Sequence, residues 1–414
     1  MKSWSPFLIA FFACGAATAQ VGPRLDSLFS SRYPANAPGV AVLVAQKGTI
    51  LYEKAFGSAS LELKTPLAPS MLFDLASVSK QFTAVAVLQL VEQGRIRLSD
   101  SIQRYIPGFP HAVTIENLLT HTSGIPDYMR LPTDDPYRER RDYTVAQVID
   151  TLKTKPLEFE PGTQFRYSNS GYFLLGYIIE RVTGEPYHTY LEKHLFKPLG
   201  LTHTFFKLPN EVIPGLVNGY KNASEKADFW SATLPYAAGG LVSNVEDLYA
   251  WQRGLPSLLK PETLQKAWTG SRGYGYGWYI NDSSISHGGA ITGFRTSVVY
   301  YPHRDLFIAV LSNCECTNAD ELTAAVSDIM LGRAYVQPSF AYAGTYTMQG
   351  HVIVIRREGN HLVADVRGQG VFPLLFSTPT TFTLQGVTDA TGEFGADGFT
   401  IHQHGDYFWK KTTP

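Results

Sequence analysis

The distribution of hydrophobic and polar residues predicts strands near both ends of a long segment and helices between them. Apolar residues alternate over 38–52 around a glycine-containing turn, which predicts a β-hairpin. The run 82–91 is apolar at nearly every position, as in a helix buried on all sides, and Gly94 can adopt the left-handed conformation that ends such a helix. Helical spacing also marks 144–157 and 172–183.

Shorter segments complete this pattern. Thr114 is a candidate cap for a helix that ends at Leu119, and Ser243 with Glu246 forms a candidate capping box for another helix. Further strands are predicted over 276–280, 296–301 and 306–311. The order of strands, long helical insert and strands again predicts an α/β domain. Its antiparallel sheet, flanked by helices, is completed by both ends of the segment.

The pattern changes near residue 336. Short alternating segments separated by turn residues predict a small all-β module there. The segments are 351–356, 361–366, 372–376, 381–384 and 399–402. We therefore expect a main domain over 20–335 and a small all-β C-terminal domain over 336–414.

The composition is that of a folded globular protein. Of 414 residues, 44% are hydrophobic and 17% are charged, and the formal net charge at pH 7 is −1. Because there is no basic surplus, we expect neither a nucleic-acid partner nor a membrane-surface partner.

Residues 1–19 have the features of a secretory signal peptide. A lysine precedes an apolar run over 7–14, and Ala17-Thr18-Ala19 forms a small-residue cleavage site. The run is too short to span a bilayer and no later stretch is long enough, so we expect a protein that is not transmembrane. Export to a bacterial periplasm or to the medium follows, with a lipoprotein signal ending at Cys14 as the alternative.

Cys314 and Cys316 are the cysteines that remain after such a cleavage. An oxidising compartment allows a disulfide between them. Residues two apart on a strand, however, lie near the upper limit of the reach of a disulfide. A bridge and two unlinked, half-buried thiols are both open.

The pair Ser77 and Lys80 is a candidate nucleophile site at the start of the apolar helix. The two residues are three apart, so on a helix their side chains share a face. The free N–H groups at a helix start favour developing negative charge. The pair alone is weak, because Ser257 and Lys260 form a second Ser-x-x-Lys, and a helix cap with a solvated charge is the alternative.

Three further segments strengthen this interpretation. Tyr167 and Asn169 lie in Phe165-Arg166-Tyr167-Ser168-Asn169-Ser170-Gly171-Tyr172. The other two are His287-Gly288-Gly289-Ala290 and Ala238-Gly239-Gly240-Leu241-Val242-Ser243. Tyr-x-Asn also occurs at Tyr220 and Tyr279, so the setting and order of Tyr167 distinguish it rather than the motif alone.

Together these motifs resemble those of the serine β-lactamase and penicillin-binding-protein superfamily. The chain is most similar to the class C β-lactamase-like branch, which includes D-alanyl-D-alanine carboxypeptidases, D-aminopeptidases and esterases with a β-lactamase fold. Segments 118–124, 196–200 and 274–278 also resemble that branch. The C-terminal module resembles the small lipocalin-like β domain often appended to such proteins.

The resemblance implies acyl transfer through a Ser77 acyl-enzyme. A serine hydroxyl needs an adjacent base, and a buried Lys80 can serve because desolvation disfavours its ammonium form. We expect Lys80 to activate Ser77 and Tyr167 to relay the proton to the leaving group, although the sequence leaves open which of the two is the base. Asn169 is expected to hydrogen-bond Lys80 or a substrate carbonyl.

The resemblance also implies an oxyanion hole made by the backbone N–H groups of Ser77 and Ala290. Gly288 and Gly289 would let a substrate lie close along the strand edge. His287 is a departure, because many relatives have a lysine that can anchor a substrate carboxylate, whereas histidine is mostly neutral at pH 7.

Three more residues are candidates for substrate binding. Arg295 could supply the missing charge or point to solvent, and Tyr128 and Tyr236 could line the pocket or belong to the core.

We therefore expect an esterase or D-peptidase acting on a small-molecule ester, D-amino-acid peptide or β-lactam, without a metal or organic cofactor. The alternatives are a D-Ala-D-Ala carboxypeptidase or β-lactamase and, outside enzymes, a penicillin-recognising sensor. The oligomeric state is not predicted.

Overall fold

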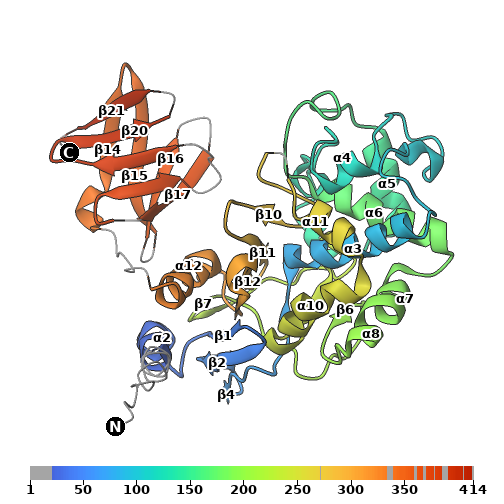
Figure 1. The fold of residues 1–414 in the computed structure, drawn as a ribbon, viewed down its shortest axis with the longest axis horizontal. Coiled ribbons are helices and arrows are strands. Elements are labelled where there is room, and N and C mark those ends of the chain that lie inside the picture. The colour runs from blue at the N-terminus through green and yellow to red at the C-terminus, as the bar shows by residue number, and fades with distance from the viewer. Residues whose placement is uncertain are drawn as a thin grey trace, which may run out of the picture. The chain divides into compact units, whose positions relative to one another are not determined.

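The computed structural model describes residues 21–270, 272–332, 339–358, 361–366, 370–376, 378–384, 390–403 and 405–412. The chain forms two compact units, Met1–Val326 and Ser327–Pro414 (Figure 1). The predicted signal peptide, residues 1–19, and residue 336, where the second domain was expected to begin, lie outside the described residues. No helix of the described segments is both long and apolar enough to cross a membrane.

A six-stranded antiparallel sheet organises the first unit, and the predicted α/β class is confirmed. Its order is β10 (Tyr279–Ile280), β11 (Ile285–Ile291), β12 (Phe294–Tyr301), β13 (Leu306–Ser312), β1 (Val40–Gln46) and β2 (Thr49–Phe56). As predicted, both ends of the segment complete one sheet. The β1–β2 hairpin turns through Lys47 and Gly48, both with positive φ. The strand predicted from 276 is shorter and begins at Tyr279.

The two faces of the sheet pack against different helices. Ala41, Leu43 and Ala45 of β1 join the main hydrophobic core with the helical insert. Residues of the opposite face contact α2 (Val21–Ser30) and α12 (Ala319–Met330). Tyr52 Oη donates to Asp26 of α2 (2.8 Å), and Ser297 Oγ shares a hydrogen bond with Thr323 of α12 (2.9 Å). The sheet is therefore the middle of three layers.

The helical insert surrounds α3 (Ser79–Glu92), which is buried almost all round, as its apolar sequence predicted. The other helices of the insert and those next to it are α4 (Ile115–Leu119), α5 (Val145–Lys153), α6 (Asn169–Thr183), α7 (Tyr187–Leu191), α8 (Lys197–Leu199), α9 (Tyr236–Gly239), α10 (Val245–Leu258) and α11 (Pro261–Ala267). Thr114 caps α4 as predicted. The cap predicted at Ser243 is wrong, because Ser243 ends a strand and Asn244 accepts the hydrogen bond that caps α10.

Short elements connect these parts. The small strands are β3 (Ser58–Ser60), β4 (Thr65–Pro66), β5 (Phe73–Asp74), β6 (Phe205–Phe206), β7 (Tyr220–Asn222), β8 (Glu225–Lys226) and β9 (Leu241–Ser243). The short helices are η1 (Ala76–Val78), η2 (Ile102–Arg104), η3 (Tyr128–Arg130), η4 (Arg138–Arg140), η5 (Glu192–Phe196), η6 (Pro302–Arg304) and η7 (Phe340–Tyr342). Strand β9 pairs with β5 and β6, which fixes the approach to η1.

The second unit is a closed antiparallel barrel, so the predicted all-β module is confirmed. Its strands are β14 (Gly344–Met348), β15 (His351–Glu358), β16 (His361–Val366), β17 (Gly370–Phe376), β18 (Thr381–Leu384), β19 (Thr391–Phe394), β20 (Gly398–His402) and β21 (Asp406–Lys411). Tyr346, Phe382, Phe394 and Phe399 pack together inside it. Side chains fill a barrel of this size, so its interior is a packed core.

Candidate active site

Ser77 lies in η1, immediately before α3, at a point where the backbone is strained. Ala76 has a φ of +48°, a left-handed conformation that side chains rarely adopt and that clusters at functional sites. The carbonyl oxygen of Leu75 accepts a hydrogen bond from Thr296 Oγ1 of β12 (3.0 Å). The turn that presents the half-buried Ser77 is thus held against the sheet.

Lys80 is fully buried and contacts Ser77 directly. Its Nζ lies 3.0 Å from Ser77 Oγ, 2.8 Å from Asn169 Oδ1 and 2.7 Å from the carbonyl oxygen of Ala238. Burial lowers the pKa of Lys80 to about 7, against the opposing effect of the Asp127 charge. Near neutral pH much of Lys80 is therefore a neutral amine, able to accept the Ser77 proton.

Tyr167 stands beside this pair. Lys80 Nζ lies 4.9 Å from the centre of its ring, and its buried hydroxyl is close enough to interact with Ser77. No group in the described segments makes a well-formed hydrogen bond to that hydroxyl. Burial raises the pKa of Tyr167 well above its usual value, so the phenol keeps its proton at neutral pH.

His121 supports Tyr167 from the loop after α4. The two ring centres lie 4.2 Å apart, and His121 Nδ1 accepts a hydrogen bond from the backbone N–H of Ser168 (3.2 Å). Burial lowers the pKa of His121 well below its usual value, so the ring is neutral. This residue fixes the strand-like segment that carries Tyr167 into α6.

Asn169 links Lys80 to a carboxylate that the sequence motifs did not single out. The amide Nδ2 of Asn169 donates to Asp127 Oδ2 (2.9 Å), while its Oδ1 accepts from Lys80. Asp127 is 7% exposed. In the sequence, Asp127 follows segment 118–124, which resembles the class C β-lactamase-like branch, but nothing there indicated contact with α6.

The segment His287-Gly288-Gly289-Ala290 lies on β11, which passes close to η1. A Cβ atom at Gly289 would lie 2.2 Å from Thr296 Oγ1 and 2.3 Å from the carbonyl oxygen of Leu75, so only glycine fits there. In the described part of the chain, β10 pairs with β11 only at Ile285 and Ser286. The edge beyond, including the exposed Ala290, leaves alternate backbone groups for a ligand.

His287 is buried and neutral. Its Nδ1 donates to the carbonyl oxygen of Gly288 (2.6 Å), so its Nε2 accepts from the Tyr274 hydroxyl (3.0 Å). Burial and the nearby Lys80 lower the pKa of His287 to about 3. The strand therefore carries no positive charge at this position.

The structure does not present the other three candidates as substrate-binding groups. Arg295 donates to the carbonyl oxygens of Ile291 and Phe294 and lies 4.0 Å from Glu315, so it is not a free cation. Tyr128 is buried, and its hydroxyl donates to the carbonyl oxygen of Leu234. Tyr236 is also buried, with 7% of its surface exposed.

The rings packed around these two tyrosines show that both belong to the core. The Tyr128 ring lies 5.1 Å from that of Phe173. The Tyr236 ring lies 4.8 Å from the same Phe173 and 5.2 Å from Tyr187. The sequence could not distinguish a pocket wall from a core, since both use aromatic residues.

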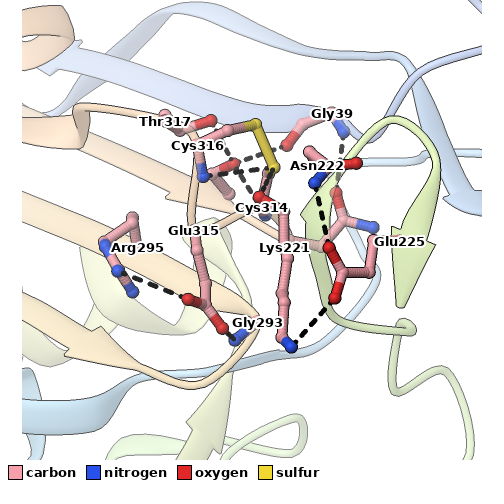
Figure 2. Close-up of a disulfide and its surroundings, with 12 residues drawn as sticks. Gly39, Lys221, Asn222, Glu225, Gly293, Arg295, Cys314, Glu315, Cys316 and Thr317 are labelled. Carbon is pink, nitrogen blue, oxygen red and sulfur yellow. Dashed lines mark hydrogen bonds and ion pairs between the residues drawn. A yellow bond between two sulfur atoms is a disulfide. The ribbon is translucent and has the colours of Figure 1, made fainter. Parts of the chain in front are cut away.

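Cys314 and Cys316 form a disulfide at the end of β13 (Figure 2). Glu315, between them, accepts a hydrogen bond from the backbone N–H of Gly293 (2.8 Å) and faces Arg295. Gly293 is in the turn between β11 and β12. The disulfide-closed turn therefore braces the hairpin that carries Gly288, Gly289 and Ala290.

A cavity of about 300 Å³ adjoins the site. Its lining includes Gly239 and Gly240, which follow the Ala238 contact of Lys80, and Ile291 and Thr292, which follow Ala290. Phe229, Trp230 and Phe294 add aromatic surface. This volume is in the range of small-molecule sites.

In the segments that the structure describes, no group of three or more His, Cys, Asp or Glu side chains could hold a metal ion.

Comparisons with known proteins place the chain in a family. The Beta-lactamase family model matches residues 26–329. Penicillin-binding protein 4* of Bacillus subtilis strain 168 is 29% identical and covers 92% of this chain and 96% of its own length.

Two solved structures share the fold. The D-amino acid amidase from Ochrobactrum anthropi SV3 has a TM-score of 0.66 at 23% identity, covering 77% of this chain and 99% of its own. EstCE1, a hydrolase with promiscuous acyltransferase activity, has a TM-score of 0.65 at 22% identity, covering 76% and 99%. Because the family model spans the residues that build the sheet, the helical insert and the Ser77 cluster, the chain belongs to the beta-lactamase family.

Proposed function

We propose that this protein is a serine hydrolase that cleaves an ester or amide through an acyl-enzyme on Ser77. The observation that carries the proposal is the fully buried Lys80, whose Nζ lies 3.0 Å from Ser77 Oγ and whose pKa is lowered to about 7. A nucleophile with a base in hydrogen-bond contact, itself oriented by a third group, is the arrangement that activates a serine.

In this mechanism the neutral Lys80 amine accepts the Ser77 proton as Oγ attacks the substrate carbonyl carbon. Tyr167 remains a phenol because its pKa is raised, so it can give its proton to the leaving oxygen or nitrogen and be reprotonated from Lys80. A proton transfer of this kind contributes typically about 10²–10⁴-fold. Water then attacks the acyl-enzyme carbonyl carbon. Lys80 and Tyr167 accept a proton from this water and deliver it to Ser77 Oγ as the bond to the acyl group breaks and the acid is released.

The tetrahedral oxygen would be stabilised by the backbone N–H groups of Ser77 and Ala290. The close fit of Gly289 against Leu75 supports this assignment, since it holds the β11 edge next to η1. Preorganised donors aimed at a developing oxyanion are a large part of catalysis in acyl transfer.

For the substrate we propose neutral acyl esters and D-amino-acid amides or peptides. His287 is neutral and Arg295 is occupied by its own hairpin and Glu315, so neither offers a carboxylate anchor. Hydrolysis of β-lactams or of peptides ending in D-Ala-D-Ala is the second candidate. The likeness to Penicillin-binding protein 4* favours this candidate.

We also propose that the mature chain is exported and begins at Gln20. The Cys314–Cys316 disulfide supports this, because disulfides persist in oxidising compartments. Amino-terminal sequencing of the protein recovered outside the cytoplasm tests it. A start at Gln20 is expected, and recovery of the uncleaved chain from the cytoplasm alone would contradict it.

A substrate panel on the purified chain tests the enzymatic proposal. We expect steady turnover of p-nitrophenyl acetate and of D-phenylalanine amide, and slower turnover of nitrocefin. Ser77→Ala should abolish all three, whereas Ser257→Ala, at the second Ser-x-x-Lys, should leave them unchanged. A single stoichiometric burst without turnover would instead indicate a sensor that binds covalently, and full activity of Ser77→Ala would refute the mechanism.

A further inference from the structure

The position of Asp127 is fixed by its neighbours rather than by chance proximity. Ser170 Oγ of α6 donates to the carbonyl oxygen of Pro126 (2.6 Å) and accepts from the backbone N–H of Tyr128 (2.9 Å). Asp127 lies between these two bonded residues, and its Oδ1 accepts from the N–H of Met129 (3.1 Å). Its other oxygen, Oδ2, is thereby directed at Asn169, next to Ser170 on α6.

The contact with Asp127 determines which atom Asn169 shows to Lys80. An amide has one acceptor and one donor group. With Nδ2 bound to the Asp127 carboxylate (2.9 Å), Oδ1 faces the Lys80 ammonium (2.8 Å). A reversed amide would place its donor against a cation and its acceptor against an anion, and both contacts would be repulsive. The hydrogen bonds that link Asp127, Asn169, Lys80 and Ser77 therefore fix the orientation of the Asn169 amide.

The charges around Lys80 also point to Asp127, because the other groups that face Lys80 are neutral. The ring centres of Tyr167, just before α6, and of Tyr172, on α6, lie 4.9 and 5.6 Å from the Lys80 Nζ, and both are neutral phenols because burial raises their pKa values. His121 and His287 face Lys80 from the loop after α4 and from β11, and burial lowers the pKa of each.

Among the described residues, Asp127 is the negative group that acts on Lys80, because its charge opposes the lowering of the Lys80 pKa. Arg130, 81% exposed, lies 3.9 Å from the Asp127 carboxylate and is largely screened by water.

We propose that Asp127 is a positioning residue that, through the amide of Asn169, holds Lys80 against Ser77 and sets the pH range in which Lys80 acts as a base. This inference rests on the proposed function of Ser77 and Lys80. It assigns a role to a residue outside the motifs that define the site.

The test is the pH dependence of kcat/KM for p-nitrophenyl acetate in wild type and in Asp127→Asn. The substitution keeps the shape and an acceptor for Asn169 but removes the charge. The ammonium is then less stabilised, so Lys80 loses its proton at lower pH. The acidic limb of the profile, where kcat/KM rises with pH as Lys80 loses its proton, should move to lower pH by about one unit. This is the size expected for loss of one nearby opposite charge.

Two more variants separate charge from packing. Asp127→Ala should move the limb similarly and also lower the plateau kcat by about tenfold, because the Asn169 amide is no longer oriented. Asp127→Glu keeps the charge and should leave the limb at its wild-type position while the plateau falls.

The matched control is Asp247→Asn. Asp247 is also buried and accepts hydrogen bonds, from the N–H of His203 and the hydroxyl of Thr204 (both 2.8 Å), but it belongs to α10. Its loss should change thermal stability and leave the limb in place. Folding of every variant is checked by circular dichroism. If Asp127→Asn does not fold, the position of the acidic limb in Asp127→Glu is compared with that of wild type and of Asp127→Ala.

Two results would overturn the inference. One is a folded Asp127→Asn enzyme whose acidic limb stays in place, and the other is an Asp127→Glu enzyme whose limb moves as far as that of Asp127→Ala. Failure of the proposed function looks different, since wild type itself would then show no Ser77-dependent turnover.

Discussion

The two walls of the site, one helical and one from the sheet, differ in what they offer a substrate. The helical wall carries Lys80, Asn169, Asp127 and Tyr167, which are joined by hydrogen bonds or ring contacts and include charged and titratable groups. The sheet wall is the β11 edge, with glycines, Ala290 and a histidine that stays neutral. Under the proposed mechanism, proton transfer is assigned to the helical wall and substrate binding to the sheet wall. Changes in the two walls should therefore have different kinetic signatures.

The largest effect should come from the helical wall. Lys80→Ala should lower kcat/KM for p-nitrophenyl acetate by about 10³–10⁴-fold and abolish the acidic limb near pH 7, because the base is lost. Lys260→Ala, in the exposed second Ser-x-x-Lys, is the control and should match wild type. A Lys80→Ala enzyme that keeps its limb would show that another group titrates there.

On the sheet wall, Gly289→Ala should reduce kcat/KM by about 10²-fold without moving the limb. The new Cβ would lie 2.2 Å from Thr296 Oγ1 and 2.3 Å from the Leu75 carbonyl oxygen, so the edge must move away from Ser77, and a displacement of about 1 Å can cost this much. Gly395→Ala, where the nearest atom is 4.0 Å from the added Cβ, should be silent. Equal rates for both variants would refute the close fit.

His287→Gln should have a smaller effect still. Since the pKa of His287 is about 3, the ring does not titrate between pH 5 and 9, and its replacement by a neutral group should leave the pH profile unchanged in shape. Loss of the Tyr274 contact should reduce kcat/KM by about two- to tenfold. A changed acidic limb in this variant would place a titrating group on the sheet wall and break the comparison.

The smallest expected effect concerns the brace behind the sheet wall. Cys314→Ser with Cys316→Ser opens a ring of three residues, for which loop-closure entropy accounts for about 1–2 kcal/mol. We expect the melting temperature to fall by a few degrees and ester hydrolysis to change less than in Gly289→Ala. A loss of activity as large as that of Lys80→Ala would mean that the brace positions the edge far more strongly than its contacts suggest.

The sequence was most informative where local pattern decides structure. The β1–β2 hairpin, the buried α3, the capped α4 and a sheet completed by both ends of the segment follow from periodicity and turn residues. The gathering of Ser77, Lys80, Tyr167 and Asn169 was expected from motif order and the family resemblance, and the structure brings these four residues together.

Hydrogen bonds and ion pairs between residues far apart in the sequence could not be predicted in the same way. From the sequence, Arg295 could supply a charge to the substrate or point to solvent, but it donates to two carbonyl groups of its own hairpin and lies 4.0 Å from Glu315. Asp127 was not among the sequence candidates, and its contact with Asn169 arises because hydrogen bonds from Ser170 hold the loop against α6. Such contacts depend on how distant segments pack, which periodicity does not encode.

The most direct test of the central claim is to trap the acyl-enzyme. The protein is mixed with excess p-nitrophenyl acetate, quenched with acid within milliseconds, digested and analysed by mass spectrometry. An acetyl group on the peptide that contains Ser77, formed faster as the pH rises through about 7 and absent in Ser77→Ala, is the predicted result. Turnover with no modified peptide, or with the acetyl group on another residue, would contradict the mechanism.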